Sequence, residues 1–144
     1  MTKLNDIAEI FDLLGDWEQR YQYLIELGEK LPDMPARYKA DENRVKPCMS
    51  TVWVHAYADQ DDKGTLHYDG DCDTSVIKGV LALLIQLAES KTADEIQQLN
   101  VDDVFEKLNL GEHLSPNRHV GVYAIVELMK QQARELKAKQ PQVA

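Results

Sequence analysis

The sequence predicts an α+β domain in which a small three-stranded antiparallel sheet packs against helices. Apolar residues recur with the 3.6-residue period of a helix near both ends of the chain, whereas between residues 51 and 69 they alternate with the period of a strand. No repeat and no linker rich in proline or glycine divides the 144 residues. We therefore predict a single domain over residues 1–144, with a frayed C-terminal tail from about residue 135.

Two helices are expected to open the domain. The apolar residues of the first fall on one helical face: Ile7, Ile10, Phe11 and Leu14. Gly15 then breaks the pattern, and Asp16 is a suitable N-cap for a second helix. That second helix should end near Lys30, because Pro32 disfavours helical geometry in the residue before it.

A sheet should follow the polar segment from Asp33 to Asn43. One face of the next strand is small and aliphatic, with Val52, Val54, Ala56 and Ala58, and the other carries Thr51, Trp53, His55 and Tyr57. We expect the aliphatic face to meet the helices. The turn over residues 59–64 leads into a strand over residues 65–69, and Arg44–Pro47 is expected to add the third strand.

The second half of the chain is predicted to be helical. Asp73, Thr74 and Ser75 offer N-cap side chains to an apolar helix from Val76 to Leu87, which should be the central core helix. Short helices are expected after a capping box formed by Thr92 and Glu95, and again over residues 101–108. A last helix should begin near Pro116 and end in a basic, frayed segment.

Composition and charge narrow the class of function. The formal net charge is −9, so the chain should repel a phosphate backbone or an anionic membrane surface, and we expect no nucleic-acid or membrane partner. The longest apolar stretch, residues 79–85, is far shorter than the ~20 residues of a membrane span. Acidic residues near the start exclude a secretory signal, which predicts a cytoplasmic protein with reduced cysteines.

The two cysteines are the leading candidates for chemistry. Cys48 lies on the connection between the expected strand Arg44–Pro47 and the strand over residues 51–58, and Cys72 lies where the hairpin meets the core helix. The helix N-terminus favours a thiolate at Cys72, whereas Asp69, Asp71 and Asp73 favour the thiol, so the sign of its pKa shift stays open. Antiparallel pairing should bring Cys48 and Cys72 to the same edge of the molecule.

Several classes of site are weighed against this pair of thiols. Zinc would need about four ligands, and neither His113 nor His119 has a paired ligand spacing. A Cys-x-x-Cys redox motif is absent, and two acidic runs lack the glycine or glutamate of a calcium loop. A metal or iron–sulfur cluster scaffold using Cys48 and Cys72 and a thiol enzyme remain as alternatives. A disulfide between the two cysteines would require α-carbons within ~7 Å.

Four ordered segments resemble the SufE/CsdE family of sulfur acceptors for cysteine desulfurases. These are Trp17-Glu18 with Tyr21 to Pro32, Cys48-x-Ser50-x-Val52-Trp53, Gly70-Asp71-x-Asp73 with Ile77-Lys78-Gly79, and His113-Leu114-Ser115-Pro116-x-Arg118. The chain departs from the usual pattern in having Pro47 where the family usually has glycine and Cys72 where it usually has serine. Residues 117, 119 and 120, which flank Arg118, also differ from those of the family.

The resemblance implies a SufE-like fold and a non-enzymatic sulfur carrier. Cys48 would accept persulfide sulfur from a SufS-like or CsdA-like cysteine desulfurase, stimulate that enzyme and pass the sulfur to a scaffold for iron–sulfur cluster assembly. Pyridoxal phosphate would belong to the desulfurase, and no cofactor is expected in this chain. Cys72 and Arg118 are possible accessory residues. The apolar neighbours of Cys48 lead us to expect that desolvation raises the pKa of its thiol in the free protein.

Overall fold

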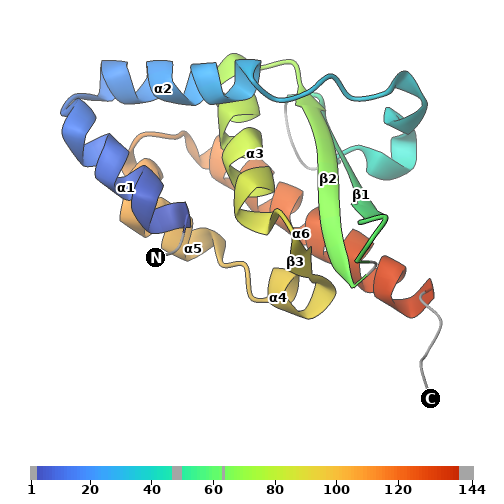
Figure 1. The fold of residues 1–144 in the computed structure, drawn as a ribbon. Helices are drawn as coiled ribbons and strands as arrows, with labels where there is room; N and C mark the ends of the chain where they lie inside the picture. The colour runs from blue at the N-terminus through green and yellow to red at the C-terminus, as the bar shows by residue number, and fades with distance from the viewer. Residues whose placement is uncertain (1–2, 47–49, 63, 140–144) are drawn as a thin grey trace.

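A computed structural model describes residues 3–46, 50–62 and 64–139 of the chain. The fold is α+β, as predicted. Its elements are α1 (Lys3–Leu14), α2 (Trp17–Glu29), η1 (Ala36–Tyr38), η2 (Asp41–Asn43), β1 (Val52–Ala58), β2 (Thr65–Cys72), α3 (Ser75–Ala88), β3 (Lys91–Thr92), α4 (Ala93–Gln97), α5 (Val101–Leu108), η3 (Leu110–Glu112) and α6 (Pro116–Lys139). Helix α2 crosses α3, α1 packs against α5, and the sheet lies on the other side of α3 (Figure 1).

The sheet has the strand order β1-β2-β3 and is antiparallel throughout. The prediction that Arg44–Pro47 supplies the third strand is wrong, because β3 takes that place beside β2. Arg44 forms only an isolated bridge with Trp53, next to a hydrogen bond from Val45 N to the Val52 carbonyl at 2.8 Å. The bridge follows directly on the 3₁₀ turn of η2, and proline at position 47 has no N–H with which to continue a ladder.

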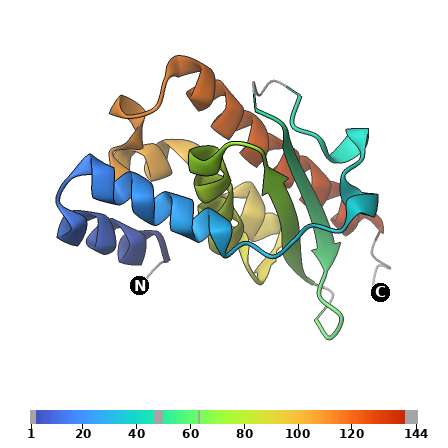
Figure 2. The ribbon, with the colours of Figure 1, turned by 90° about the horizontal axis from the view of Figure 1, so that it is seen from above.

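One face of the sheet belongs to the hydrophobic core, and it is the aliphatic face that the alternation predicted. Val52, Val54 and Ala56 of β1 are buried, as are Leu66 and Tyr68 of β2. Helices α3 and α6 cover this face, and α3 lies between α2 and α6 (Figure 2). The Tyr68 hydroxyl donates to the Met129 carbonyl of α6 at 2.7 Å, so this buried hydroxyl has a hydrogen-bond partner. Burial raises the pKa of Tyr68.

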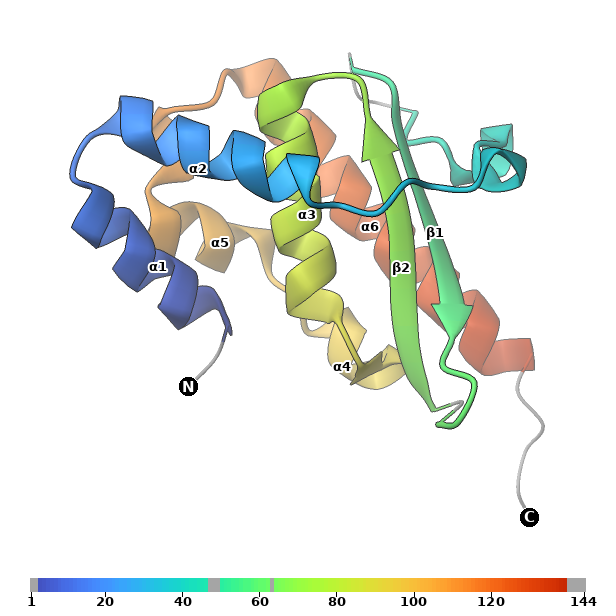
Figure 3. The same cartoon turned by 45° about the horizontal axis from the view of Figure 1, so that its top comes forward.

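The opposite face of the sheet is aromatic, and the segment after α2 crosses it (Figure 3). Tyr38 stacks on His55 with ring centroids 3.9 Å apart, and the Lys39 ammonium lies 5.3 Å from the centroid of the Trp53 ring. Tyr57, nearer the hairpin turn, remains 41% exposed. This connection therefore covers the part of the face nearest the start of β1.

The helix ends follow local hydrogen-bonding rules at most of the predicted positions. Asp16 accepts from Gln19 N at 2.9 Å, and Thr92 and Glu95 form the predicted capping box.

Helix α6 continues to Lys139, beyond residue 135, where the sequence analysis placed the start of a frayed tail. Its last turns are held because Leu136 packs against the core and the Lys137 ammonium pairs with Asp94 at 2.6 Å.

A glutamine of α6 satisfies the outer edge of β1. The Gln132 carboxamide accepts from Ala56 N at 3.0 Å and donates to the Val54 carbonyl at 2.8 Å. The same nitrogen lies 3.1 Å from Asn43 Oδ1, and Asn43 in turn donates to the Tyr38 carbonyl at 2.9 Å. One side chain thus bonds two main-chain groups of the edge strand and links them to the connection that crosses the sheet.

The crossing of α2 and α3 depends on glycine. A Cβ built on Gly79 would lie 2.0 Å from the Leu24 carbonyl oxygen, and one built on Gly28 would lie 2.9 Å from Gly79 N. Both contacts are with backbone, which cannot move aside as the end of a flexible side chain can. The two helices are therefore in main-chain contact at this point.

We expect Gly79→Ala to lower the free energy of unfolding by about 3 kcal/mol or more, because the added methyl group must push two packed helices apart. Urea unfolding followed by circular dichroism measures the loss. Gly111→Ala is the matched control, since a Cβ there meets nothing closer than 3.9 Å. Equal midpoints for the two variants would contradict the close crossing.

An ionic cluster ties the hairpin to the end of α3. His67 of β2 bonds Asp59 through Nε2 at 2.5 Å and Glu89 through Nδ1. The hydrogen bond to Asp59 raises the pKa of His67, burial acts against this rise, and Glu89 adds to it. The same bond and two backbone N–H groups of the turn lower the pKa of Asp59 to about 2. The charged forms of His67 and Asp59 therefore favour the folded state.

The stabilisation from this cluster should depend on pH in a defined direction. The His67 contribution is complete below its unfolded pKa of 6.5 and is lost as pH rises through the higher folded value. The Asp59 contribution is complete at pH values above its unfolded pKa of 3.8 and is lost as the pH falls toward its folded pKa of about 2. The difference in unfolding free energy between the parent and His67→Gln should thus peak between about pH 4 and pH 6.5. A difference that grows with pH above that window would contradict this assignment.

Candidate functional site

The candidate site lies where β1 begins and β2 ends. The register pairs Val52 with Cys72, so the residues just before β1 and just after β2 are brought side by side. Cys48 falls outside the described residues, and its role therefore stays a prediction. Ser50, two positions later in the sequence, is described and partly buried. The geometry below concerns the described residues that surround this entry into the sheet.

Two reciprocal hydrogen bonds extend the pairing beyond the strands. Asp73 N donates to the Thr51 carbonyl at 3.2 Å, and Thr51 N donates to Asp73 Oδ1 at 3.1 Å. Next to them, the Ser50 and Thr74 hydroxyl oxygens lie 2.6 Å apart, and the Thr74 hydroxyl also donates to Asp73 Oδ1 at 3.2 Å. The chain that enters β1 is thus bonded to the N-terminal end of α3 through both main chain and side chains.

Cys72 lies on the core face, with 6% of its surface exposed. Its Sγ accepts a hydrogen bond from Thr74 N at 3.4 Å, and its own N–H donates to Asp71 Oδ1 at 2.8 Å. A sulfur in this position helps to hold the turn into α3, as a serine oxygen in the same place would. Because Cys48 is not described, the distance between the two α-carbons, and with it the hypothesis of a disulfide between them, stays untested.

The carboxylate beside Cys72 is neutralised by lysines. Asp71 pairs with Lys39 at 2.7 Å and with Lys78 at 3.2 Å. Burial acts to raise the pKa of Asp71, but hydrogen bonds from Lys39, Cys72 N and Lys78 outweigh it, so that the pKa is lowered overall. Asp71 therefore opposes a thiolate at Cys72 less than its charge alone suggests, because two lysine ammonium groups lie beside that carboxylate.

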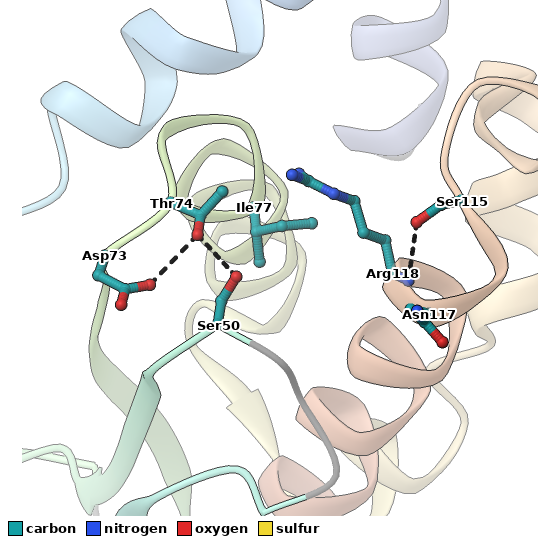
Figure 4. A pocket seen from close by; sticks show the side chains of 7 residues that line it. All are labelled: Ser50, Asp73, Thr74, Ile77, Ser115, Asn117 and Arg118. Atoms are coloured by element: carbon teal, nitrogen blue, oxygen red, sulfur yellow. Dashed lines mark hydrogen bonds between the residues drawn. The ribbon is translucent and has the colours of Figure 1, made fainter.

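Arg118 lies at the same cavity as the entry into β1. This cavity has a volume of about 320 Å³, and Figure 4 shows the side chains that line it: Ser50, Asp73, Thr74, Ile77, Ser115, Asn117 and Arg118. The start of α6 is held by Ser115, whose carbonyl and hydroxyl oxygens both lie near Arg118 N, at 3.0 and 3.4 Å. The structure thus brings Arg118 together with the residues that follow Cys48 and Cys72 in the sequence.

A second cavity of about 300 Å³ adjoins the first and shares Ser115 and Arg118 with it. Its other walls come from α2, α3 and the turn before α6: Tyr21, Val76, His113 and Leu114. Trp17 stacks on His113 with ring centroids 3.7 Å apart, and the Tyr21 hydroxyl donates to the His113 carbonyl at 2.6 Å. The aromatic residues of α2 therefore fix the turn that positions Arg118.

The metal ligands considered from the sequence can be placed only where the structure describes them, and Cys48 is not among these residues. No group of three or more His, Cys, Asp or Glu side chains within it is arranged to hold a metal ion. His113 stacks on Trp17 and His119 lies against Phe105 with centroids 4.8 Å apart, and neither lines the cavity beside Ser50. Among the described helices, none is long and apolar enough to cross a membrane.

Sequence reasoning identified Cys72 and Arg118 but assigned no role to Thr74 beyond a possible N-cap. In the structure Thr74 occupies the N-cap position of α3, yet its side chain caps no backbone N–H and bonds Ser50 and Asp73 instead. The signal that could have found this contact is the antiparallel register itself, since Val52 opposite Cys72 places Ser50 opposite Thr74.

Comparison with known proteins agrees with the arrangement of these motifs. The family model described as SufE, Fe-S metabolism associated domain, matches residues 5–133. The chain belongs to the SufE family. An uncharacterized SufE-like protein of Rhizobium meliloti is 38% identical over 135 residues, which cover 92% of this chain and 96% of that protein. A second, from Rhizobium etli, is 33% identical over 135 residues, covering 93% and 91%.

The fold is also found in a solved structure. The solution structure of a hypothetical protein from Thermus thermophilus superimposes with a TM-score of 0.77, covering 96% of this chain and all of that one at 22% identity. That likeness supports the fold, and the family assignment rests on the domain model and the two relatives. Membership of the SufE family associates the chain with iron–sulfur metabolism.

Proposed function

We propose that this SufE-family chain is a sulfur carrier that takes persulfide sulfur from a cysteine desulfurase onto Cys48 and delivers it for iron–sulfur cluster assembly. The observation that carries the proposal is the cavity at the entry into β1, which Ser50 of the Cys48 motif lines together with Thr74 and Arg118. Three motifs that are far apart in the sequence converge there. A carrier needs such a surface, because its thiol must meet a protein-bound sulfur.

The transfer itself is an exchange reaction between sulfurs. The Cys48 thiol gives up its proton, and the thiolate attacks the outer sulfur of the desulfurase persulfide. A new S–S bond forms at Cys48 while the old one breaks, and the desulfurase cysteine leaves as a thiolate, so that no net oxidation occurs. Pyridoxal phosphate would belong to the desulfurase and serve the earlier step, in which that enzyme removes sulfur from free cysteine. The carrier needs no cofactor of its own for this step.

The docking surface for the desulfurase would combine the entry into β1, the start of α3 and Arg118. The guanidinium stands at the boundary of two cavities in a chain whose net charge is −9. This positive charge can pair with an anionic group of the desulfurase, although the chain as a whole is acidic. Carboxylates outside the contact would influence the rate at which the two proteins meet. Binding at this surface would also account for stimulation of the desulfurase.

Cys48→Ser should abolish the mass increase of about one sulfur atom that the parent gains on incubation with a cysteine desulfurase and free cysteine. Stimulation of the desulfurase should be lost with it. Cys72→Ser is the matched control and should still gain sulfur, because an oxygen can replace Sγ as acceptor for Thr74 N. Intact-mass spectrometry reads both variants. Sulfur uptake by Cys48→Ser but not by Cys72→Ser would refute the assignment.

The same samples separate the carrier from the alternative of a metal or cluster scaffold. A scaffold that used Cys48 and Cys72 would purify with zinc or show iron–sulfur absorption, and each single cysteine variant would lose the metal. A carrier would gain sulfur without either signal. Metal analysis and the visible absorption spectrum of the parent distinguish the two.

Arg118→Glu should weaken stimulation of the desulfurase and leave the fold intact, because a partly exposed arginine at a helix start contributes little to stability. The change should appear as a rise in the carrier concentration needed for half-maximal stimulation. Arg134→Glu, an exposed arginine near the other end of α6, carries the same change in net charge and is the control. Equal effects of the two reversals would point to overall charge instead of this surface.

A further inference from the structure

Thr74 differs from the N-cap residues of α2, α4 and α5, whose side chains each accept a hydrogen bond from a backbone N–H. An N-cap threonine ordinarily accepts a hydrogen bond from a backbone N–H of the first helical turn, and Thr92 does so at the start of α4. The Thr74 side chain makes no such bond, although its backbone occupies the N-cap position of α3. The helix therefore gives up the stabilisation of a cap, and the hydroxyl serves the contact with Ser50 and Asp73 instead.

The Ser50 and Thr74 hydroxyls are bonded to each other whichever of them donates. A threonine hydroxyl has one proton, and an ionised carboxylate can only accept. With the Thr74 proton directed to Asp73 Oδ1 at 3.2 Å, Ser50 is the donor in the 2.6 Å contact, and with the Thr74 proton directed to Ser50, Ser50 is the acceptor. In both arrangements the Ser50 side chain is attached to the start of α3.

Two successive residues of the chain that follows Cys48 are thus held by the start of α3. Ser50 is held through its side chain by Thr74, and Thr51 is held through its N–H and carbonyl by Asp73. Thr74 is itself fixed by the bond from its N–H to Cys72 Sγ at 3.4 Å. The second attachment, at Thr51, resembles continued strand pairing, whereas the first depends on a single hydroxyl.

We infer that Thr74 is a positioning residue for the Cys48 thiol: its hydroxyl, acting through Ser50, sets how that thiol is presented to the desulfurase persulfide. The inference rests on the proposed carrier function and extends it to a residue outside the Cys48 motif. The position of the thiol affects the rate of transfer, because a misplacement of about 1 Å slows a reaction between two held groups.

The test compares variants that differ in one hydroxyl group. Thr74→Val removes the hydroxyl at nearly constant shape, and Thr74→Ser retains it. Thr65→Val is the matched control, because the Thr65 hydroxyl donates to the Asp62 carbonyl at 2.9 Å in the turn at the other end of β2. Single-turnover sulfur uptake from a persulfide-loaded desulfurase is measured by intact mass, well below the unfolding temperature of each variant.

We expect Thr74→Val to slow uptake about tenfold, the factor that follows from loss of roughly 1.4 kcal/mol of transition-state stabilisation. Thr74→Ser and Thr65→Val should remain within about twofold of the parent. A merely structural role would lower the unfolding temperature of Thr74→Val without slowing uptake under these conditions. Uptake by Thr74→Val at the parental rate overturns the inference.

Ser50→Ala removes the same hydrogen bond by deleting the other hydroxyl, and it replaces Thr74→Val in the test if that variant fails to fold. It should slow uptake to a similar extent, and the double variant Ser50→Ala/Thr74→Val should be no slower than the slower single variant, because one bond can be lost only once. Effects that multiply in the double variant would show that the two residues act independently, which also overturns the inference.

A second readout does not need the desulfurase. Alkylation of Cys48 by iodoacetamide, measured by peptide mapping, should be faster by more than about twofold in Thr74→Val and Ser50→Ala, because the chain after Cys48 has lost an attachment, and unchanged in Thr65→Val. If the parent takes up no sulfur, the carrier proposal fails and this rate still decides whether Thr74 controls the thiol. Equal alkylation rates in all variants would refute that control.

Discussion

The antiparallel register of β1 and β2 is the constraint on which the site depends. Val52 opposite Cys72 fixes which residues meet beyond the ends of the strands, and it does so because the buried faces of both strands must point toward the same helices. A slip by one residue would turn Val54 out of the core and separate Ser50 from Thr74. The packing of the core therefore determines, through the register, what surrounds the chain that follows Cys48.

The helices complete the site from the other side. Main-chain contact between α2 and α3 at Gly79 sets their crossing, and Trp17 at the start of α2 then reaches His113 in the turn before α6. That turn leads directly to Arg118 at the shared wall of the two cavities. Sheet register and helix crossing thus place groups from three distant segments around one cavity, although neither feature contains a group that would react.

Local patterns predicted the fold better than they predicted the site. Alternation over residues 51–58 identified the buried face of β1, and the Thr92 capping box needs only residues three positions apart. The third strand was misplaced because β3 has two residues, too few for any periodicity, and is selected by its position after α3. The role of Thr74 depends on a contact across 24 positions, which no local signal carries.

The carboxamide of Gln132 has a consequence for how the protein behaves among other chains. An edge strand offers unpaired N–H and carbonyl groups to any extended polypeptide, which is the usual first step of sheet-to-sheet aggregation. In β1 the central pair of these groups is already bonded to a side chain that imitates the peptide of a neighbouring strand. An incoming strand must displace that amide and its contact with Asn43 before it can add to the sheet, so the open edge is a poor template for growth.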